Sequence, residues 1–230
     1  MSLQLVDVGS ICTFFSRLLA PTTEHDEATS APIFDTIVSV LTMLVRLRQD
    51  LVTAILPHLT HLLRLLLAAL QVPRPHLGPR QLREVSDRLP RFVSVRADAT
   101  GSLDVDSATI LARLFSALIS KTTAVQHFGR SAHKDTAAST TTSLVKPLTH
   151  HAPAVLLTYL EILSAPLSML SLDVRNKLEP GIFALCAACG ERGRDSIMAG
   201  TAGAQLDSSS KLIFKTLWRD FEKQKYVGTG

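Results

Sequence analysis

Cysteine and histidine are the residues in this sequence best suited to chemistry, and both occur in pairs. Cys186 and Cys189 form a Cys-X-X-Cys spacing, which zinc sites and redox disulfides use. Zinc normally takes four ligands, and no second Cys-X-X-Cys accompanies this one. A redox pair usually follows a strand, whereas these thiols lie in a helical pattern that Gly190 closes. We therefore interpret them as small buried thiols that pack against neighbouring side chains.

The histidines lack the companions that a metal site needs. His58 and His61 share one face of a predicted helix, and His150 and His151 are adjacent, but no acidic or thiolate ligand lies close to either pair in the sequence. The phosphate-binding patterns GxxxxGK[ST] and GxGxxG and the nucleophile pattern GxSxG are absent. The sequence therefore predicts no catalytic, cofactor-binding or metal-binding residues, and a protein that is not an enzyme.

Arginines are concentrated in the middle of the chain. Guanidinium groups can hold phosphates or carboxylates through paired hydrogen bonds, so this stretch is a candidate contact for RNA or for an acidic partner. An exposed linker with local ion pairs explains the same residues, because Glu84 and Asp87 lie among them. The candidate residues are Arg74, Arg80, Arg83, Arg88, Arg91 and Arg96.

The C-terminal stretch combines positive charge with aromatic rings. At 100° per residue its cations and its large apolar side chains fall on different sides of one helix. The apolar side is expected to dock this helix on the preceding ones, and the basic side is a second candidate contact for RNA, diluted by Asp220 and Glu222. The basic residues are Lys211, Lys215, Arg219 and Lys223, and the docking residues are Phe214, Leu217, Trp218 and Phe221.

Helices must position these side chains, because apolar residues recur at helical spacing through most of the chain. We predict helices over 6–20, 36–49, 51–70 and 103–121, and several more from 144 onward. Asp35 is the expected cap of the second helix, and Asp106 or Ser107 that of the fourth. N-capping also explains the two carboxylates of Asp104 and Asp106 before the fourth helix. Pro57 either divides the third run or begins its second part.

Two segments interrupt the helical pattern most strongly. The proline-rich stretch 71–80 is a predicted break, and the polar, low-complexity stretch 122–143 is a predicted mobile loop. Hydrophobic residues make up 46% of the chain but aromatics only 5%, so Leu, Ala, Val and Ile dominate the core. We expect a single all-α domain over 1–230, an irregular helical stack resembling an α-solenoid end domain of the HEAT or armadillo kind.

Charge and cysteine content narrow the class of protein further. The formal net charge is +4, and residues 51–100 carry seven basic and three acidic side chains, which suits an acidic partner. Three scattered cysteines favour a reducing compartment. The most apolar stretch, 51–70, contains Pro57, two histidines and Arg64, so a membrane span is not expected there.

Three blocks near the end of the chain resemble one known family. They are His151-Ala152-Pro153 before an apolar helix with a tyrosine, Val174-Arg175 followed by Pro180-Gly181-Ile182-Phe183-Ala184-Leu185, and Ile213-Phe214-Lys215-Thr216-Leu217-Trp218. In this order they resemble the C-terminal domain of the nucleolar pre-ribosomal-associated protein two, or unhealthy ribosome biogenesis protein two, family. The resemblance is closest over 150–230. Trp218 replaces the usual tyrosine, and 188–205 looks like an insertion.

The resemblance implies a non-enzymatic scaffold in the nucleolus. Such proteins work in early assembly of the large ribosomal subunit (pre-60S) and in pre-rRNA processing, with other assembly factors that include a DEAD-box helicase. It further implies that this chain corresponds to the C-terminal part of a longer helical-repeat protein. No membrane, cofactor or small-molecule substrate is expected. The alternative is a helical-repeat protein-interaction adaptor unrelated to ribosomes.

Overall fold

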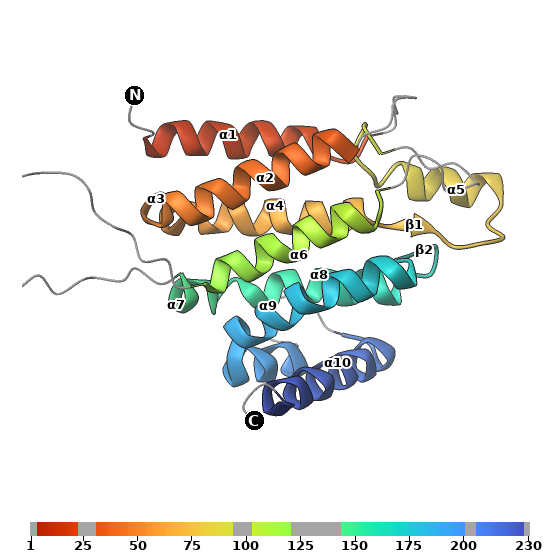
Figure 1. Ribbon diagram of the computed structural model, residues 1–230. Coiled ribbons are helices and arrows are strands. Elements are labelled where there is room, and N and C mark those ends of the chain that lie inside the picture. Colours follow the sequence, from red (N-terminus) through yellow and green to blue (C-terminus); the bar gives the residue numbers. More distant parts are fainter. Residues whose placement is uncertain (1–3, 23–30, 94–102, 121–143, 201–205, 228–230) are drawn as a thin grey trace, which may run out of the picture.

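The described part of the chain is almost entirely helical (Figure 1). The computed structural model describes residues 4–22, 31–93, 103–120, 144–200 and 206–227. These residues form ten helices and one sheet of two very short strands. The all-α prediction is therefore confirmed. The predicted mobile loop at 122–143 lies outside the described residues.

The long helices pack in two layers. In one layer α1 contacts α4, α4 contacts α8, and α8 contacts α10; in the other, α2 contacts α6 and α6 contacts α9. In Figure 1 the chain runs from left to right along α1, α4 and α8, and back along α2, α6 and α9. Successive helix pairs are thus stacked side by side, as in an α-solenoid. The bounds are α1 (Leu5–Leu18), α2 (Ala31–Leu47), α4 (Leu56–Ala69), α6 (Val105–Ile119), α8 (Ala152–Ser164), α9 (Leu172–Ala199) and α10 (Ser208–Val227).

Short elements connect the long helices. The predicted break at 71–80 holds β1 and the turn that leads into α5, and β1 pairs antiparallel with β2, with Val72 opposite Met169. The predicted run 51–70 is divided at Ile55, and Pro57 lies in the first turn of α4, where a missing N–H costs nothing. The bounds are α3 (Gln49–Ala54), β1 (Val72–Pro73), α5 (Pro79–Ser86), α7 (Val145–Leu148) and β2 (Ser168–Met169).

Asp35 does not cap α2, contrary to the prediction. The helix already begins at Ala31, so Asp35 lies within its second turn. Its Oδ1 accepts a hydrogen bond of 3.0 Å from Oγ of Ser107, which is fully buried on α6. The carboxylate satisfies a buried hydroxyl on the neighbouring helix, a role that depends on tertiary packing and leaves no local signal.

The cap of α6 is Asp104, whose carboxylate the sequence indicated as a capping group, and not Asp106 or Ser107. The N-cap is Asp104, whose Oδ1 accepts from the backbone N–H groups of Asp106 (3.1 Å) and Ser107 (3.0 Å). Asp106 and Ser107, the residues expected to cap, instead stand in the first turn. Both candidates lay within three residues of the true cap, because any of these side chains can accept from the first free N–H groups.

Close packing of α6 and α9 centres on Gly181. A Cβ placed on this glycine would lie 2.7 Å from Cα and 2.9 Å from the carbonyl oxygen of Ala112. Two backbones meet here with no side chain between them, and only glycine leaves the space. Ile182 and Leu185, in the same Pro-Gly block, are fully buried.

The last part of α9 is turned away from the first. Gly190 has φ of 63° and ψ of −176°, which breaks the helical path and favours glycine. The segment after it leads to α10, which packs on α8 and α9 (Figure 1). None of the described helices is long and apolar enough to cross a membrane.

Candidate interaction surfaces

The central arginines are carried by α5 and the residues around it. α5 begins at Pro79, in the favoured first position of a helix, and turns Val85 into the protein. Arg80 and Arg83 consequently point away from the core and are exposed. Within the described residues, neither guanidinium has a hydrogen bond or an acidic partner.

The remaining members of the arginine group have different surroundings. Arg88 pairs with Glu84 one turn earlier at 2.6 Å. Arg74 is partly buried, and its Nε and Nη2 donate to the carbonyl oxygen of Ala165 at 3.1 and 3.0 Å. It therefore holds the β1 region against the end of α8. Arg91 is exposed in the turn after Pro90, and Arg96 lies outside the described residues.

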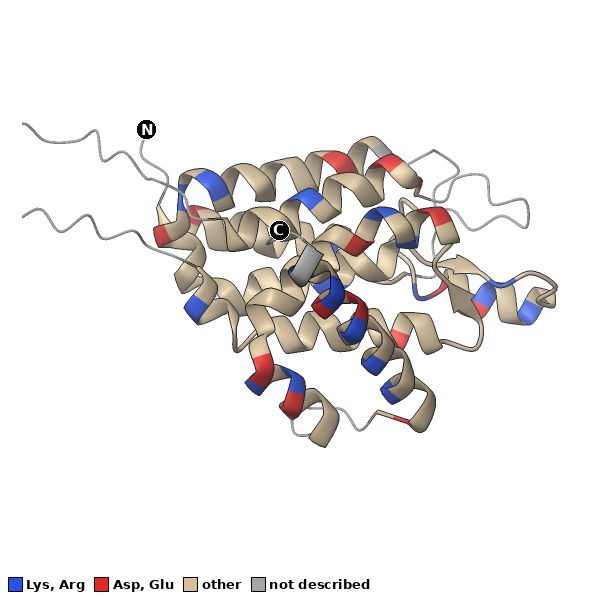
Figure 2. Cartoon of the chain, turned by 60° about the horizontal axis from the view of Figure 1, so that its bottom comes forward, with Lys and Arg blue, Asp and Glu red and all other residues tan. Residues whose placement is uncertain are grey.

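On α10 the cations divide into two groups. Lys211 and Lys215, near the start of the helix, have no acidic partner among the described residues. Arg219 and Lys223 both approach the carboxylate of Asp220, at 3.9 and 3.2 Å. Figure 2 shows the cations of α10 along the front of the molecule and those of α5 at its right end. The structure thus does not join the two predicted basic groups into one surface.

The opposite side of α10 faces α8 and α9. Phe214 is only 1% exposed and Trp218 is also buried, while Leu217 and Phe221 pack partly buried against the same core. Trp218 stands between two other rings, with centroids 5.7 Å from Phe214 and 5.4 Å from Phe221. Phe221 also meets Phe183 of α9, at 6.0 Å.

A polar bridge beside Trp218 was not predicted. The indole Nε1 donates to Oε1 of Glu222 at 2.8 Å, and Arg194 lies over the indole ring at 5.7 Å from its centroid. Arg194 also approaches Glu222, at 3.6 Å. This cation, from the segment that looked like an insertion, fixes α10 to the turned end of α9. Its spacing along the chain holds no clue to the contact.

At the other end, α10 starts from a well-defined cap. Oδ1 of Asp207 accepts from the backbone N–H of Ser210 at 2.8 Å, and the Ser209 hydroxyl donates to the same carboxylate. Hydrogen bonds from Ser209 and Ser210 lower the pKa of Asp207 to about 2. The cap is charged throughout the physiological range and complements the positive end of the helix.

The paired cysteines and histidines do not form a metal site in the described part of the chain. Cys186 and Cys189 are fully buried, and burial raises the pKa of both thiols, that of Cys189 to about 12. No cluster of three His, Cys, Asp or Glu side chains that could bind a metal occurs among the described residues. His58 and His61 are exposed on α4. With their raised pKa values, the thiols of Cys186 and Cys189 are protonated and unreactive at neutral pH.

An apolar hollow lies beside α5. Its volume is about 510 Å³, and it is bounded by the β1 turn, α5 and the first turns of α6 and α9. Leu82, Met169 and Val174 form part of its wall, with Asp104 and His76 among the polar lining groups. Asp104 already accepts the backbone hydrogen bonds that cap α6, and the described lining of the hollow is mainly apolar.

Comparison with known proteins agrees with the three C-terminal blocks. A family model described as the Urb2/Npa2 family matches residues 1–229. The expected family is thereby confirmed, and the match extends far beyond 150–230. This is a family of nucleolar ribosome biogenesis factors, not known as enzymes. No curated protein and no solved structure matches the chain significantly.

Proposed function

Because this chain belongs to the Urb2/Npa2 family, we propose that it is a non-enzymatic scaffold for assembly of the large ribosomal subunit in the nucleolus. It presents packed helices to other pre-60S factors, including a DEAD-box helicase, and contacts pre-rRNA through basic side chains. The family match across residues 1–229 carries this proposal. An adaptor unrelated to ribosomes is not favoured by that match.

The arrangement of cations supports a contact with RNA or with acidic protein segments. Arg80 and Arg83 are exposed and carry positive charge that no described carboxylate neutralises. A phosphate that binds there displaces no existing ion pair, unlike one at Arg88. Lys211 and Lys215 offer a second, separate pair. We place the RNA contact first at α5, where the unpaired cations lie one turn apart.

The scaffold proposal is tested by affinity purification of the tagged protein from cells, with microscopy of its location. Nucleolar signal and recovery of pre-60S factors, the helicase among them, are expected. A protein excluded from the nucleolus that recovers none of these factors would contradict the proposal.

The RNA contact is tested separately with a single-stranded RNA oligonucleotide. Replacing Arg80 and Arg83 by Glu should weaken binding and reduce the slope of log affinity against log salt by about 1.4, since about 0.7 is lost per phosphate contact. The matched control replaces Arg17 and Lys177, exposed cations of α1 and α9, by Glu. Equal losses in both variants would show only a general charge effect.

A further inference from the structure

A small pocket lies where the turned end of α9 meets α10 (Figure 1). Its volume is about 290 Å³. Aromatic rings form its wall on the α10 side, small residues form its wall on the α9 side, and each helix adds a carboxylate. We call it the α10 pocket, bounded mainly by Ala187, Gly190, Glu191, Trp218, Phe221 and Glu222.

The turn in α9 opens this pocket. Gly190, at positive φ, redirects the chain, and a Cβ placed on it would meet no described atom within 4 Å apart from its chain neighbours and its own helix backbone. Ala187, one turn earlier, is exposed and contributes only a methyl group. The small residues at this bend therefore leave a space that no described side chain fills.

The described lining of the α10 pocket has the chemistry of a cation site. The rings of Trp218 and Phe221 form a corner, at 69° to each other and with centroids 5.4 Å apart. Aromatic faces attract cations through their quadrupole, that of tryptophan most strongly. The carboxylates of Glu191 and Glu222 add negative charge at the same place. A positive group on an apolar stem matches both parts of this lining.

Glu191 is the carboxylate left for an incoming charge. It is exposed and has no cationic partner among the described residues. Lys225 also lines the pocket, but it has an interaction of its own. Two carboxylates thus stand against one ammonium group in the described lining, which favours a cation over phosphate or an acidic segment.

The chain already holds one guanidinium group against the same helix. Arg194 lies 5.7 Å from the centroid of the Trp218 ring and 3.6 Å from Glu222. It does not line the α10 pocket, so it does not fill it. Its charge is shared between Glu222 and Asp195, which lies at 3.8 Å. The contact shows that this ring and carboxylate accept a guanidinium, and it leaves Glu191 uncompensated among the described residues.

Size and shape narrow the ligand to one side chain. Pockets for small molecules are usually about 300–1,000 Å³, so the α10 pocket lies at the lower end of that range. It suits a single long side chain better than a larger ligand. Arginine fits better than lysine, because its planar guanidinium stacks on rings and pairs with a carboxylate through two parallel hydrogen bonds.

From these observations we propose that the α10 pocket binds one arginine side chain of a partner protein. The guanidinium lies against the aromatic corner of Trp218 and Phe221 and pairs with Glu191. This inference rests on the proposed scaffold function, because it names the chemistry of one protein partner. It is independent of the RNA contact, which uses cations elsewhere on the molecule.

The test titrates the full chain with short Gly-Ser peptides at constant ionic strength. The first peptide carries one arginine, the second one lysine, and the third one citrulline, the neutral isostere of arginine. ¹⁵N NMR reports the site, because Trp218 is the only tryptophan and its indole N–H donates to Glu222 in the pocket wall. The arginine peptide should shift the indole signal saturably, the lysine peptide should bind more weakly, and the citrulline peptide should not bind.

Two variants make the test specific. Glu191→Gln should weaken the arginine peptide about fivefold, the upper range for an exposed ion pair, whereas the control Glu161→Gln, an exposed carboxylate of α8, should leave binding unchanged. Ala187→Leu should weaken binding about tenfold or more by filling the pocket from an exposed helical position, where leucine is well tolerated. Unchanged thermal melting shows that each variant is folded.

Three results would overturn the proposal. These are an indole signal that does not respond to the arginine peptide, equal binding of that peptide and either comparison peptide, or the same affinity in the Glu191→Gln and Glu161→Gln variants. Each leaves the scaffold function intact, because that is judged by recovery of pre-60S factors with the wild-type protein. Failure to recover those factors would in turn leave the peptide titration unaffected.

Discussion

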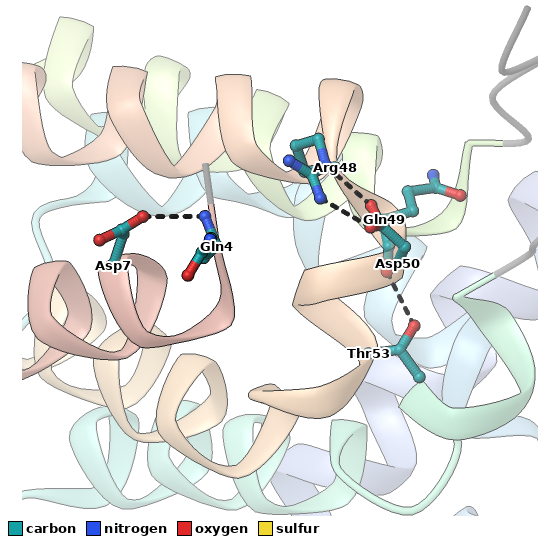
Figure 3. A network of polar contacts seen from close by, with 6 residues as sticks. All are labelled: Gln4, Asp7, Arg48, Gln49, Asp50 and Thr53. Carbon is teal, nitrogen blue, oxygen red and sulfur yellow. Dashed lines mark hydrogen bonds and ion pairs between the residues drawn. The ribbon is translucent and has the colours of Figure 1, made fainter. Parts of the chain in front are cut away.

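Gln49 shows how one residue can work against the stability of the fold. Among the buried side-chain nitrogens and oxygens of the described residues, its Nε2 alone lacks a hydrogen-bond partner. The side chain is 7% exposed and sits where α2 passes into α3, beside the Arg48–Asp50 pair (Figure 3). A buried donor without an acceptor costs about 1–3 kcal/mol.

Replacing Gln49 by Met should therefore raise the free energy of unfolding by about 1 kcal/mol, since the shape is kept and the unpaired amide removed. Urea unfolding measures the change. The control is Gln71→Met, which should destabilise, because Gln71 donates to the carbonyl of Ala68 and accepts from Ser168. A loss of stability in both variants would mean that the Gln49 amide is satisfied in solution.

The buried thiols give the protein a dependence on alkaline pH. Burial raises the pKa of Cys186 and Cys189 above their ordinary 9.0. A raised folded pKa contributes stability below pH 9, and this is lost as the pH rises toward the folded values. Between pH 9 and 12 the free energy of unfolding should fall by up to about 1.4 kcal/mol per pH unit for each thiol.

Urea unfolding at intervals across this range checks the prediction against the Cys186→Ala, Cys189→Ala variant. Other groups titrate in both proteins, among them Tyr159, whose pKa burial also raises. The difference in slope between the two proteins isolates the thiols. Parallel curves would show that the thiols are accessible to solvent in the folded state.

Residue roles were predictable from the sequence only where local spacing decides them. The exposure of Arg80 and Arg83 follows from their place on a short amphipathic helix. The hydrogen bond from Arg74 to the Ala165 carbonyl oxygen and the contact of Arg194 with the Trp218 ring do not follow from local spacing. Both contacts join residues that are distant in the chain or separated by a turn, so packing decides them.

At the scale of elements, the contact of α6 with α9 depends on the missing side chain of Gly181. Gly181→Ala should destabilise the protein by about 1–3 kcal/mol, because the new Cβ meets the backbone of Ala112 and the helices must separate. Gly9→Ala in α1 is the matched control. Apart from its chain neighbours and its own helix backbone, no described residue has an atom within 4 Å of the added Cβ, so this substitution should stabilise the protein by about 0.5–1 kcal/mol.

Thermal and urea unfolding measure the free energy of unfolding of both glycine variants, which should change in opposite directions. If Gly181→Ala were as stable as Gly9→Ala, the close approach of α6 and α9 would not exist in solution.

Helices were easier to predict than their ends. Apolar periodicity placed α1 and α6 within two residues at each end, because each buries one continuous face. The start of α2 was wrong by about one turn, because Asp35 is a good cap by type but serves Ser107 instead. The two-residue strands β1 and β2 are too short for any alternating pattern to reveal them.

At the scale of the whole molecule, we expect the stack to unfold as one cooperative unit, in keeping with a single helical domain over 1–230. Trp218 is the only tryptophan and reports the α10 end, whereas far-ultraviolet circular dichroism reports all helices. In urea the two signals should change together, because core packing is continuous from α1 to α10. An earlier Trp218 transition would show that α10 unfolds separately, as terminal repeats can.

The opposed directions of the two helix layers have an electrostatic consequence. α1, α4 and α8 run one way and α2, α6 and α9 the other (Figure 1), so each edge of the stack mixes amino-terminal and carboxy-terminal helix ends. Their macrodipoles largely cancel, and the backbone lends neither edge a lasting preference for anions or cations. Discrimination between charged partners is left to side chains, and a few substitutions could redirect it without altering the fold.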